Sequence, residues 1–231
     1  MEHIVILTGA GISAESGLGT FRDADGLWTK YDLEDVATPQ GYQRNPDLVL
    51  EFYNARRENC RDAAPNAAHY ALARLAREFD GKVTLITQNI DDLHERGGSP
   101  EVIHMHGELM RALCASCSHQ WDWPGSMRLS DPCPACSAKG AVRPDVVWFG
   151  EMPYHMERII ELVGTATLFV AIGTSGAVYP AAGFVTEARA AGIETLEINL
   201  EPSDVAGQFD RRILGPASET VPTWVASLIG T

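Results

Sequence analysis

Short apolar runs alternate with longer segments of helical periodicity along most of this chain. The runs are typical of buried strands because they are short and bounded by turn-forming residues. We expect strands at residues 3–7, 82–87, 101–105, 146–149, 167–172 and 194–200. We expect helices at residues 46–62, 67–79, 181–191 and 221–229, the first with Asn45 as its N-cap and Pro46 at its first position. This alternation predicts an α/β fold whose parallel sheet is covered on both faces.

Two segments interrupt the alternation. Residues 20–64 are polar and then helical, and residues 109–142 carry two pairs of cysteines. Both resemble insertions into the α/β domain, which would consist of residues 1–19, 65–108 and 143–231. We expect the helical insertion and the cysteine segment to form a small domain together, with a binding cleft between the two parts.

The cysteine pairs have the spacing of a metal site. Cys114-x2-Cys117 and Cys133-x2-Cys136 are separated by fifteen residues. Each pair places two thiolates on one tight turn, and the loop between them lets four thiolates surround a tetrahedral zinc ion. A complete set of four leaves no open coordination position, so the predicted zinc is structural. The fifth cysteine, Cys60, has no partner in the sequence and is expected to be a packed or half-exposed thiol without a catalytic role.

Composition excludes some classes of function. The chain has 231 residues and a formal charge of −13, from 18 Lys and Arg against 31 Asp and Glu. This excess of acid argues against nucleic acid as a partner and is compatible with basic, lysine-bearing proteins. No apolar run is long enough to span a bilayer, and no secretion signal precedes the first strand, so a cytoplasmic location without membrane contact is expected.

The first strand leads into a glycine-rich turn. Gly9-x-Gly11-x-x-Ala14 lets the backbone approach a diphosphate at the start of a helix, which favours a dinucleotide site. The acidic residue that binds ribose in dehydrogenases is expected about twenty positions later. Asp23 and Asp25 come too early and lie in an insertion. A hydride-transfer enzyme is therefore disfavoured.

An ordered set of motifs continues from this turn. The motifs are residues 9–23 (GAGISAESGLGTFRD), 87–94 (TQNIDDLH), 106–108 (HGE), 143–151 (RPDVVWFGE) and 173–175 (GTS). Together with the cysteine spacing, they resemble the sirtuin family of NAD-dependent protein lysine deacylases over nearly the whole chain. The resemblance implies a Rossmann-type NAD-binding domain, NAD as a consumed co-substrate, one structural Zn2+ and acyl-lysine-bearing proteins as substrates.

The resemblance also assigns roles to residues. His106 is implied as the catalytic base, Asn89 as the residue that orients ribose and water, and Asp91 as the partner of the nicotinamide amide. The implied NAD contacts are Gly9, Ala10, Gly11, Ser13, Ala14, Glu15, Phe21, Arg22, Trp28, Gln88, Asn89, Ile90, Asp91, Gly173, Thr174, Ser175, Asn199, Leu200, Glu201 and Ala217. Acyl-lysine peptides are expected to add a strand between Phe149-Gly150-Glu151 and Val178-Tyr179-Pro180.

The chemistry requires a base near neutral pH. NAD can lose nicotinamide if the acyl oxygen of the modified lysine captures the ribose, after which a ribose hydroxyl must be activated. Histidine fits because its pKa lies near working pH. The products would be nicotinamide, deacylated lysine and acyl-ADP-ribose.

Tyr53 and Arg56 predict which acyl group is preferred. They are three positions apart in the first expected helix and so share one face. Together they can offer a hydroxyl and a guanidinium to a carboxylate. Their position matches the pair that marks desuccinylase-type sirtuins, which implies removal of succinyl, malonyl or glutaryl groups and, more weakly, of acetyl.

Two other functions remain open. The chain could be a sensor that binds NAD or ADP-ribose without turnover, or a transferase that moves ADP-ribose onto a protein. Nicotinamide release separates them. A deacylase requires an acyl-lysine peptide for this release, a transferase requires only unmodified protein, and a sensor releases no nicotinamide.

Overall fold

The computed structural model describes residues 2–19, 31–123 and 125–230. Its larger sheet has six parallel strands in the order β3-β2-β1-β7-β8-β9. These strands are β1 (His3–Thr8), β2 (Lys82–Thr87), β3 (Ile103–His104), β7 (Leu168–Ile172), β8 (Glu194–Asn199) and β9 (Arg211–Leu214). The predicted α/β class with a parallel sheet is confirmed.

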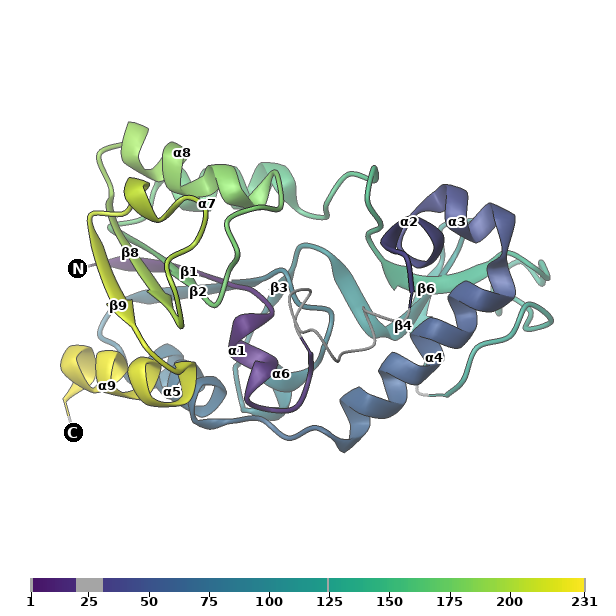
Figure 1. Cartoon of the computed structure of the whole chain (residues 1–231), viewed down its shortest axis with the longest axis horizontal. Coiled ribbons are helices and arrows are strands. Elements are labelled where there is room, and N and C mark those ends of the chain that lie inside the picture. Colours follow the sequence, from purple (N-terminus) through teal and green to yellow (C-terminus); the bar gives the residue numbers. More distant parts are fainter. Residues whose placement is uncertain (1, 20–30, 124, 231) are drawn as a thin grey trace.

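Helices cover both faces of this sheet (Figure 1). One layer contains α5 (Ala67–Glu78) and α9 (Ala217–Ile229), and the other contains α7 (Met156–Gly164) and α8 (Phe184–Ala190). Successive residues of β1 alternate between the two layers. Ile4 and Ile6 pack toward α5 and α9, while Val5 and Leu7 pack toward α7 and α8. Residues 4–7 of β1 and all of β7 are therefore apolar and buried, as expected at the centre of a sheet covered on both sides.

The strand order reverses direction between β1 and β7. From β1 the chain adds β2 and β3 on one side, and it later adds β7, β8 and β9 on the other side. In open α/β sheets, ligands bind beyond the carboxyl ends of the strands at such a reversal. The short helices α1 (Gly11–Ala14) and α6 (Leu93–Arg96) follow β1 and β2 at this edge.

A smaller part of the molecule lies beside this edge (Figure 1). It contains helices α2 (Leu33–Val36), α3 (Pro39–Arg44) and α4 (Pro46–Asp62). It also contains an antiparallel sheet in the order β5-β4-β6, made of β4 (Gly107–Cys114), β5 (Gln120–Asp122) and β6 (Val142–Val146). This sheet extends beyond residues 109–142 at both ends, and the division into two domains stays a prediction.

Polar contacts join α4 to the small sheet. The fully buried Arg57 donates from Nε to Leu109 O at 2.8 Å. Met127, in the loop between the cysteine pairs, bonds the Asn54 side chain through both of its backbone groups. Met127 N donates to Asn54 Oδ1 at 2.8 Å, and Asn54 Nδ2 donates to Met127 O at 2.9 Å. Helix α4 therefore depends on the fold of the segment that carries the cysteines.

The elements expected from sequence differ from those observed in several places. Helix α4 has the expected bounds, and the Asn45 side chain accepts from Leu48 N at its start. The strand expected at 146–149 is wrong, because β6 ends at Val146 and the next residues leave the sheet. The last helix begins at Ala217, four residues before the expected start. The expected helix at 181–191 is split into a 3-10 turn, Ala181–Gly183, and α8.

Within the described part of the chain, no helix is both long enough and apolar enough to cross a membrane.

Candidate active site

The loops after β1 and β7 lie backbone against backbone at the strand reversal. Gly11 N donates to Gly173 O at 2.9 Å, and Gly9 N donates to Ile172 O at 3.0 Å. A Cβ atom on Gly9 would lie 2.8 Å from Gly173 O, and one on Gly173 would lie 2.5 Å from Ile12 N. Gly173 also has a φ of +63°, which side chains with a Cβ rarely adopt. Only glycine fits these positions, and Ala10 and Gly11 in the same turn are half-buried.

The loops after β7, β8 and β9 form a continuous rim beside this contact. Asn199 Nδ2 donates to Thr174 O at 2.7 Å, and Gly215 N donates to Asn199 O at 2.9 Å. The rim also carries other residues expected to contact NAD, namely Ser175, Leu200, Glu201 and Ala217. At the end of α1, the carboxylate of Glu15 accepts from Ser218 N at 3.0 Å and from the Ser218 hydroxyl. The β1 loop is thereby tied to the start of α9.

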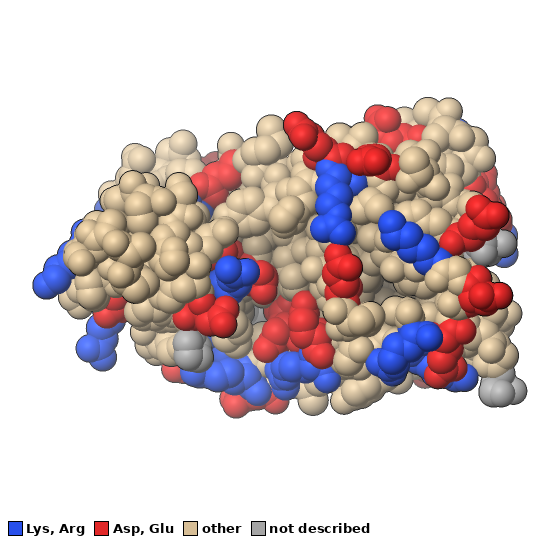
Figure 2. Space-filling view, turned by 180° about the vertical axis from the view of Figure 1, so that it is seen from behind, with Lys and Arg blue, Asp and Glu red and all other residues tan. Residues whose placement is uncertain are grey.

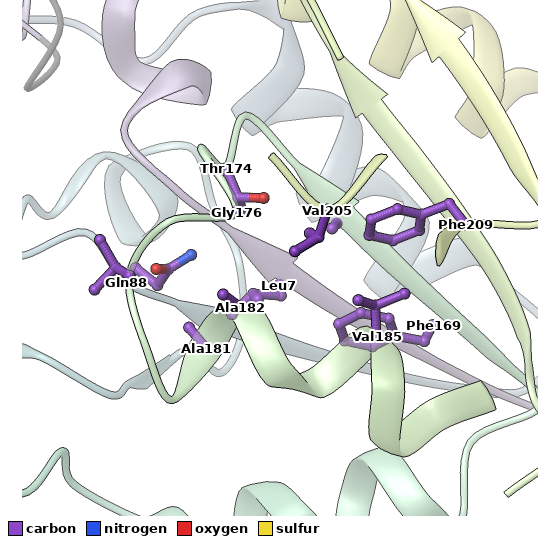
Figure 3. A pocket seen from close by; sticks show the side chains of 12 residues that line it. Leu7, Gln88, Phe169, Thr174, Gly176, Ala181, Ala182, Val185, Val205 and Phe209 are labelled. Atoms are coloured by element: carbon purple, nitrogen blue, oxygen red, sulfur yellow. The ribbon is translucent and has the colours of Figure 1, made fainter. Parts of the chain in front are cut away.

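A pocket opens next to the rim (Figure 3). Its polar side chains come from Gln88 and Thr174, and most of the remaining lining is apolar. The full lining is Leu7, Gln88, Phe169, Ala171, Thr174, Gly176, Val178, Ala181, Ala182, Val185, Val205 and Phe209. The structure thus brings Gln88 and Thr174, which are expected to contact NAD, together with Val178, which is expected to contact the peptide.

Buried hydrogen bonds connect Asn89 and Asp91 through Ser13. The Ser13 hydroxyl donates to Asp91 Oδ2 at 3.1 Å and accepts from Asn89 Nδ2 at 3.1 Å. Asp91 Oδ1 also accepts from Leu93 N at 3.1 Å. Burial raises the pKa of Asp91, and the bonds from Leu93 and Ser13 act in the opposite direction. The sequence named all three residues but did not indicate that Ser13 joins the other two.

Ser13 also contacts a second buried layer that the sequence analysis missed. His69 Nε2 lies 3.4 Å from Ser13 Oγ, and the rings of His69 and His94 are 4.9 Å apart. His94 Nε2 is 3.0 Å from Thr8 Oγ1 on β1. Burial lowers the pKa of His69 to about 4 and lowers that of His94 well below its usual value. Neutral histidines therefore support the floor of the site.

His106 lies where the two sheets meet, between β3 and β4. Its Nδ1 is 2.9 Å from Gln88 O. A carbonyl can only accept, so Nδ1 carries the hydrogen and Nε2 holds the free lone pair. Burial lowers the pKa of His106, while the bond to Gln88 raises it by less. The half-buried imidazole is thus neutral near pH 7 and is able to accept a proton.

The acidic limb of the pH profile should report this imidazole. We expect kcat/KM of the free enzyme to fall with a midpoint below pH 6.5, because the pKa of His106 is lowered by burial and its protonated form cannot act as a base. The measurement is kcat/KM for an acyl-peptide as a function of pH. A midpoint clearly above 6.5 would contradict the assignment.

Tyr53 and Arg56 lie together on the face of α4 that packs toward the site. The Arg56 guanidinium lies 5.8 Å from the centre of the Tyr53 ring and 5.7 Å from that of Phe52. Tyr53 belongs to an apolar cluster with Trp148 and with Ile90 of the loop after β2. Burial lowers the pKa of Arg56, and the negative charge of Asp91 is among the influences that raise it. The structure therefore brings the predicted acyl-reading pair close to the predicted nicotinamide loop.

Each segment expected to bind the peptide backbone has exposed residues. The exposed fraction is 45% for Phe149 and 72% for Tyr179. The Glu151 carboxylate is held by Arg143, whose Nη1 and Nη2 donate to its two oxygens at 2.7 and 2.9 Å. Val147 N donates to His106 O at 2.9 Å, so the chain that leads to Phe149 runs beside the predicted base. Phe21, Arg22 and Trp28 lie outside the described residues.

The four cysteines form one cluster. All four Sγ atoms lie within 4.8 Å of one another, and two pairs, Cys114–Cys136 and Cys117–Cys133, are 3.7 Å apart. Four sulfurs at about 2.3 Å from a tetrahedral zinc would be about 3.8 Å apart. The donor set therefore fits one zinc ion with no open coordination position.

The two halves of this cluster share the same turn. Ser118 N donates to Cys114 O, and Ser137 N donates to Cys133 O, each at 2.8 Å. Ser118 and Ser137 both adopt a left-handed conformation, with φ of 59° and 60°. The sequence spacing indicated two tight turns, but it did not indicate this backbone geometry.

Comparisons with known proteins show which family this chain belongs to. A family model described as "Sir2 family" matches residues 9–180. A protein of Caulobacter vibrioides named "NAD-dependent protein deacylase" is 59% identical over 98% of this chain and 96% of its own length. A Vibrio cholerae protein of the same name is 55% identical over 99% of this chain and 94% of its own length. A crystal structure of a Sir2 homologue in complex with NAD is 39% identical, covers 98% of this chain and 89% of that chain, and has a TM-score of 0.90. The chain belongs to the Sir2 family.

Proposed function

We propose that this protein is an NAD-dependent protein lysine deacylase that prefers short dicarboxylic acyl groups. The activity is supported by relatives that are more than half identical over nearly their whole length and are named NAD-dependent protein deacylases. The site supports it as well, because a neutral histidine, a buried amide–carboxylate pair and a glycine-lined strand reversal meet at one edge of the sheet.

The loops at the strand reversal would bind the nucleotide. Gly9, Gly11 and Gly173 keep the backbone bare where a diphosphate would approach. The rim around Thr174 and Asn199 would hold the adenosine half. A fixed, narrow turn of this kind favours an anion because backbone N–H groups can point toward it.

The reacting half of NAD would lie over the loop after β2. Asp91 would receive the nicotinamide amide, and Asn89 would orient ribose and water. Both are held by Ser13, so their side chains are set before any ligand arrives. His106 would accept the proton of a ribose hydroxyl at Nε2, the nitrogen that its bond to Gln88 leaves free.

The acyl preference is carried by one observation, the contact between Tyr53 and Arg56 on α4. An acyl-lysine that reaches His106 would extend its acyl group past Ile90 toward this pair, because Tyr53 packs in the same apolar cluster as Ile90. A guanidinium and a phenol can together hold a carboxylate, as in succinyl-, malonyl- or glutaryl-lysine. An acetyl group lacks that carboxylate and would still fit, with weaker binding.

The charge on the surface bears on whether nucleic acid is a partner. Figure 2 shows basic side chains interleaved with acidic ones on the face turned away from Figure 1. With the net charge of −13, this supports the prediction that nucleic acid is not a partner. Nicotinamide release that requires an acyl-lysine peptide would separate the proposed activity from an ADP-ribosyltransferase or a sensor.

The acyl preference is tested by Arg56→Met, which keeps much of the side-chain length and removes the charge. Loss of a charge-assisted bond, roughly 1.5–3 kcal/mol, should lower kcat/KM for a succinyl-peptide about 10- to 150-fold. Deacetylation should be largely retained. The measurement is kcat/KM for succinyl- and acetyl-peptides of one sequence.

A matched control is Arg74→Met on α5, where a partly exposed arginine pairs with Glu78 at 2.9 Å. A surface pair of this kind contributes little, so neither rate should change. Equal losses on both peptides in Arg56→Met would show that Arg56 supports the fold and does not read the acyl group.

A further inference from the structure

Trp148 is fixed in place from two sides. The Arg143 guanidinium lies 3.4 Å from the centre of a Trp148 ring, and Arg143 is itself held by Glu151. The backbone N–H of Trp148 donates to Glu151 Oε2 at 2.8 Å. The side chain is 3% exposed. Glu151, in the segment expected to meet the peptide, thus holds both the backbone of Trp148 and the guanidinium that stacks on its indole.

The indole N–H points at Tyr53. Trp148 Nε1 donates to Tyr53 Oη at 2.9 Å, and both side chains are buried. An indole N–H can only donate, so the Tyr53 oxygen must be the acceptor in this bond. The Tyr53 hydrogen is consequently directed away from Trp148. Among the described residues, no acceptor for that hydrogen is found.

Tyr53 keeps this hydrogen at working pH. Burial raises the pKa of the Tyr53 phenol, and the nearby positive charge of Arg56 and the bond from Trp148 lower it by less. The phenol is therefore neutral and remains a donor. Arg56, on the same helix face, adds a positive charge beside it. Both groups suit a carboxylate oxygen.

We infer that Trp148 is a positioning residue for acyl selectivity, whose indole N–H fixes the Tyr53 hydroxyl as a donor to the distal carboxylate of a dicarboxylic acyl-lysine. This inference rests on the proposed function, in which Tyr53 and Arg56 read that carboxylate. Without the indole N–H, the hydroxyl can turn so that its oxygen, rather than its hydrogen, faces the carboxylate. The Tyr53 hydroxyl would then have to be oriented when the substrate binds, and the entropy lost in orienting it would weaken binding.

The test is a double-mutant cycle with Trp148→Phe and Tyr53→Phe. Phenylalanine keeps an aromatic face for Arg143 and removes only the N–H donor and part of the ring. We expect Trp148→Phe to lower the ratio of kcat/KM for succinyl- over acetyl-peptide roughly 2- to 12-fold, the effect of one ordinary hydrogen bond. The change should fall mainly on KM for the succinyl-peptide. In a Tyr53→Phe background, Trp148→Phe should leave the ratio unchanged, because the group through which it acts is gone.

Several outcomes would overturn the inference. Equal losses on both peptides would show a purely structural role, and a further loss of the ratio in the Tyr53→Phe background would show that Trp148 acts independently of the hydroxyl. If Trp148→Phe does not fold, site-specific replacement of Trp148 by 3-benzothienylalanine removes the N–H at nearly constant volume, and the same ratio decides.

The proposed function and this inference fail in different ways. A parent enzyme without preference for the succinyl-peptide, and with a ratio unaffected by Arg56→Met, overturns both. A parent that prefers the succinyl-peptide, and loses that preference in Arg56→Met but keeps it in Trp148→Phe, overturns only the role of Trp148.

Discussion

His106→Ala should lose deacylation by a factor of about 10²–10⁴, the usual contribution of a positioned general base. The imidazole is held by Gln88 O at 2.9 Å, and burial lowers its pKa, so its Nε2 lone pair is available near pH 7. Alanine removes that lone pair without disturbing the backbone bond from Val147 N to His106 O. The measurement is kcat/KM for one acyl-peptide at saturating NAD.

The same variant should still bind NAD. The glycine contacts and the rim after β7 and β8 do not depend on the His106 side chain. NAD should therefore raise Tm of the variant about as much as it raises Tm of the parent, since a ligand that binds only the folded state stabilises it. Near-native turnover by a folded His106→Ala protein would remove His106 from the mechanism.

Removal of zinc should unfold the cysteine segment and abolish activity indirectly. Structural zinc supplies about 10–16 kcal/mol of apparent binding free energy in small modules, which is also folding free energy. The module touches the site at three points. Strand β4 begins after His106, β6 leads to Trp148, and the loop between the cysteine pairs holds Asn54 of α4. Loss of the metal should therefore raise amide exchange in residues 109–142 and also in α4.

Cys133→Ser and Cys60→Ser form a matched pair for this test. Cys133 belongs to the cluster, whereas Cys60 is buried in α4 with its Sγ 3.5 Å from Asp92 Oδ1. The parent and Cys60→Ser should each contain one zinc per chain, and Cys133→Ser should contain none and be inactive. A metal-free protein that turns over normally would rule out the structural role.

Sequence patterns located elements best where local and tertiary signals agree. Helix α4 was predicted with the observed bounds because Asn45 and Pro46 fix its start. The apolar run at 146–149 misled the strand prediction. The strand β6 instead contains Arg143, Pro144 and Asp145, which are buried because they are paired or packed. Asp145, for example, accepts from Gln120 Nε2 at 3.1 Å and from the Tyr154 hydroxyl at 2.8 Å. Hydrogen bonds that allow a polar residue to be buried in a strand come from distant parts of the chain, so they leave no periodic pattern in the sequence.

The candidate site, too, could be predicted from the sequence only in part. Motifs identified His106, Asn89, Asp91 and the four cysteines as residue types suited to their chemistry. They could not give the direction of any hydrogen bond. That Ser13 joins Asn89 to Asp91, and that Trp148 donates to Tyr53, depends on contacts between residues 76 to 95 positions apart. Strand β9 was missed for another reason, because its two arginines give an exposed edge strand no apolar pattern.

The backbone contact between the β1 and β7 loops also limits how this chain can evolve. A clash between two side chains can be relieved by a second substitution, but the atoms that a Cβ on Gly9 or Gly173 would meet include Gly173 O and Ile12 N. No substitution removes a carbonyl or an amide nitrogen. These glycines therefore have no compensating neighbours, and a lineage that lost one could recover only by reversion. Gly164 and Gly207, which have no atom within 4 Å of an added Cβ, are free to drift.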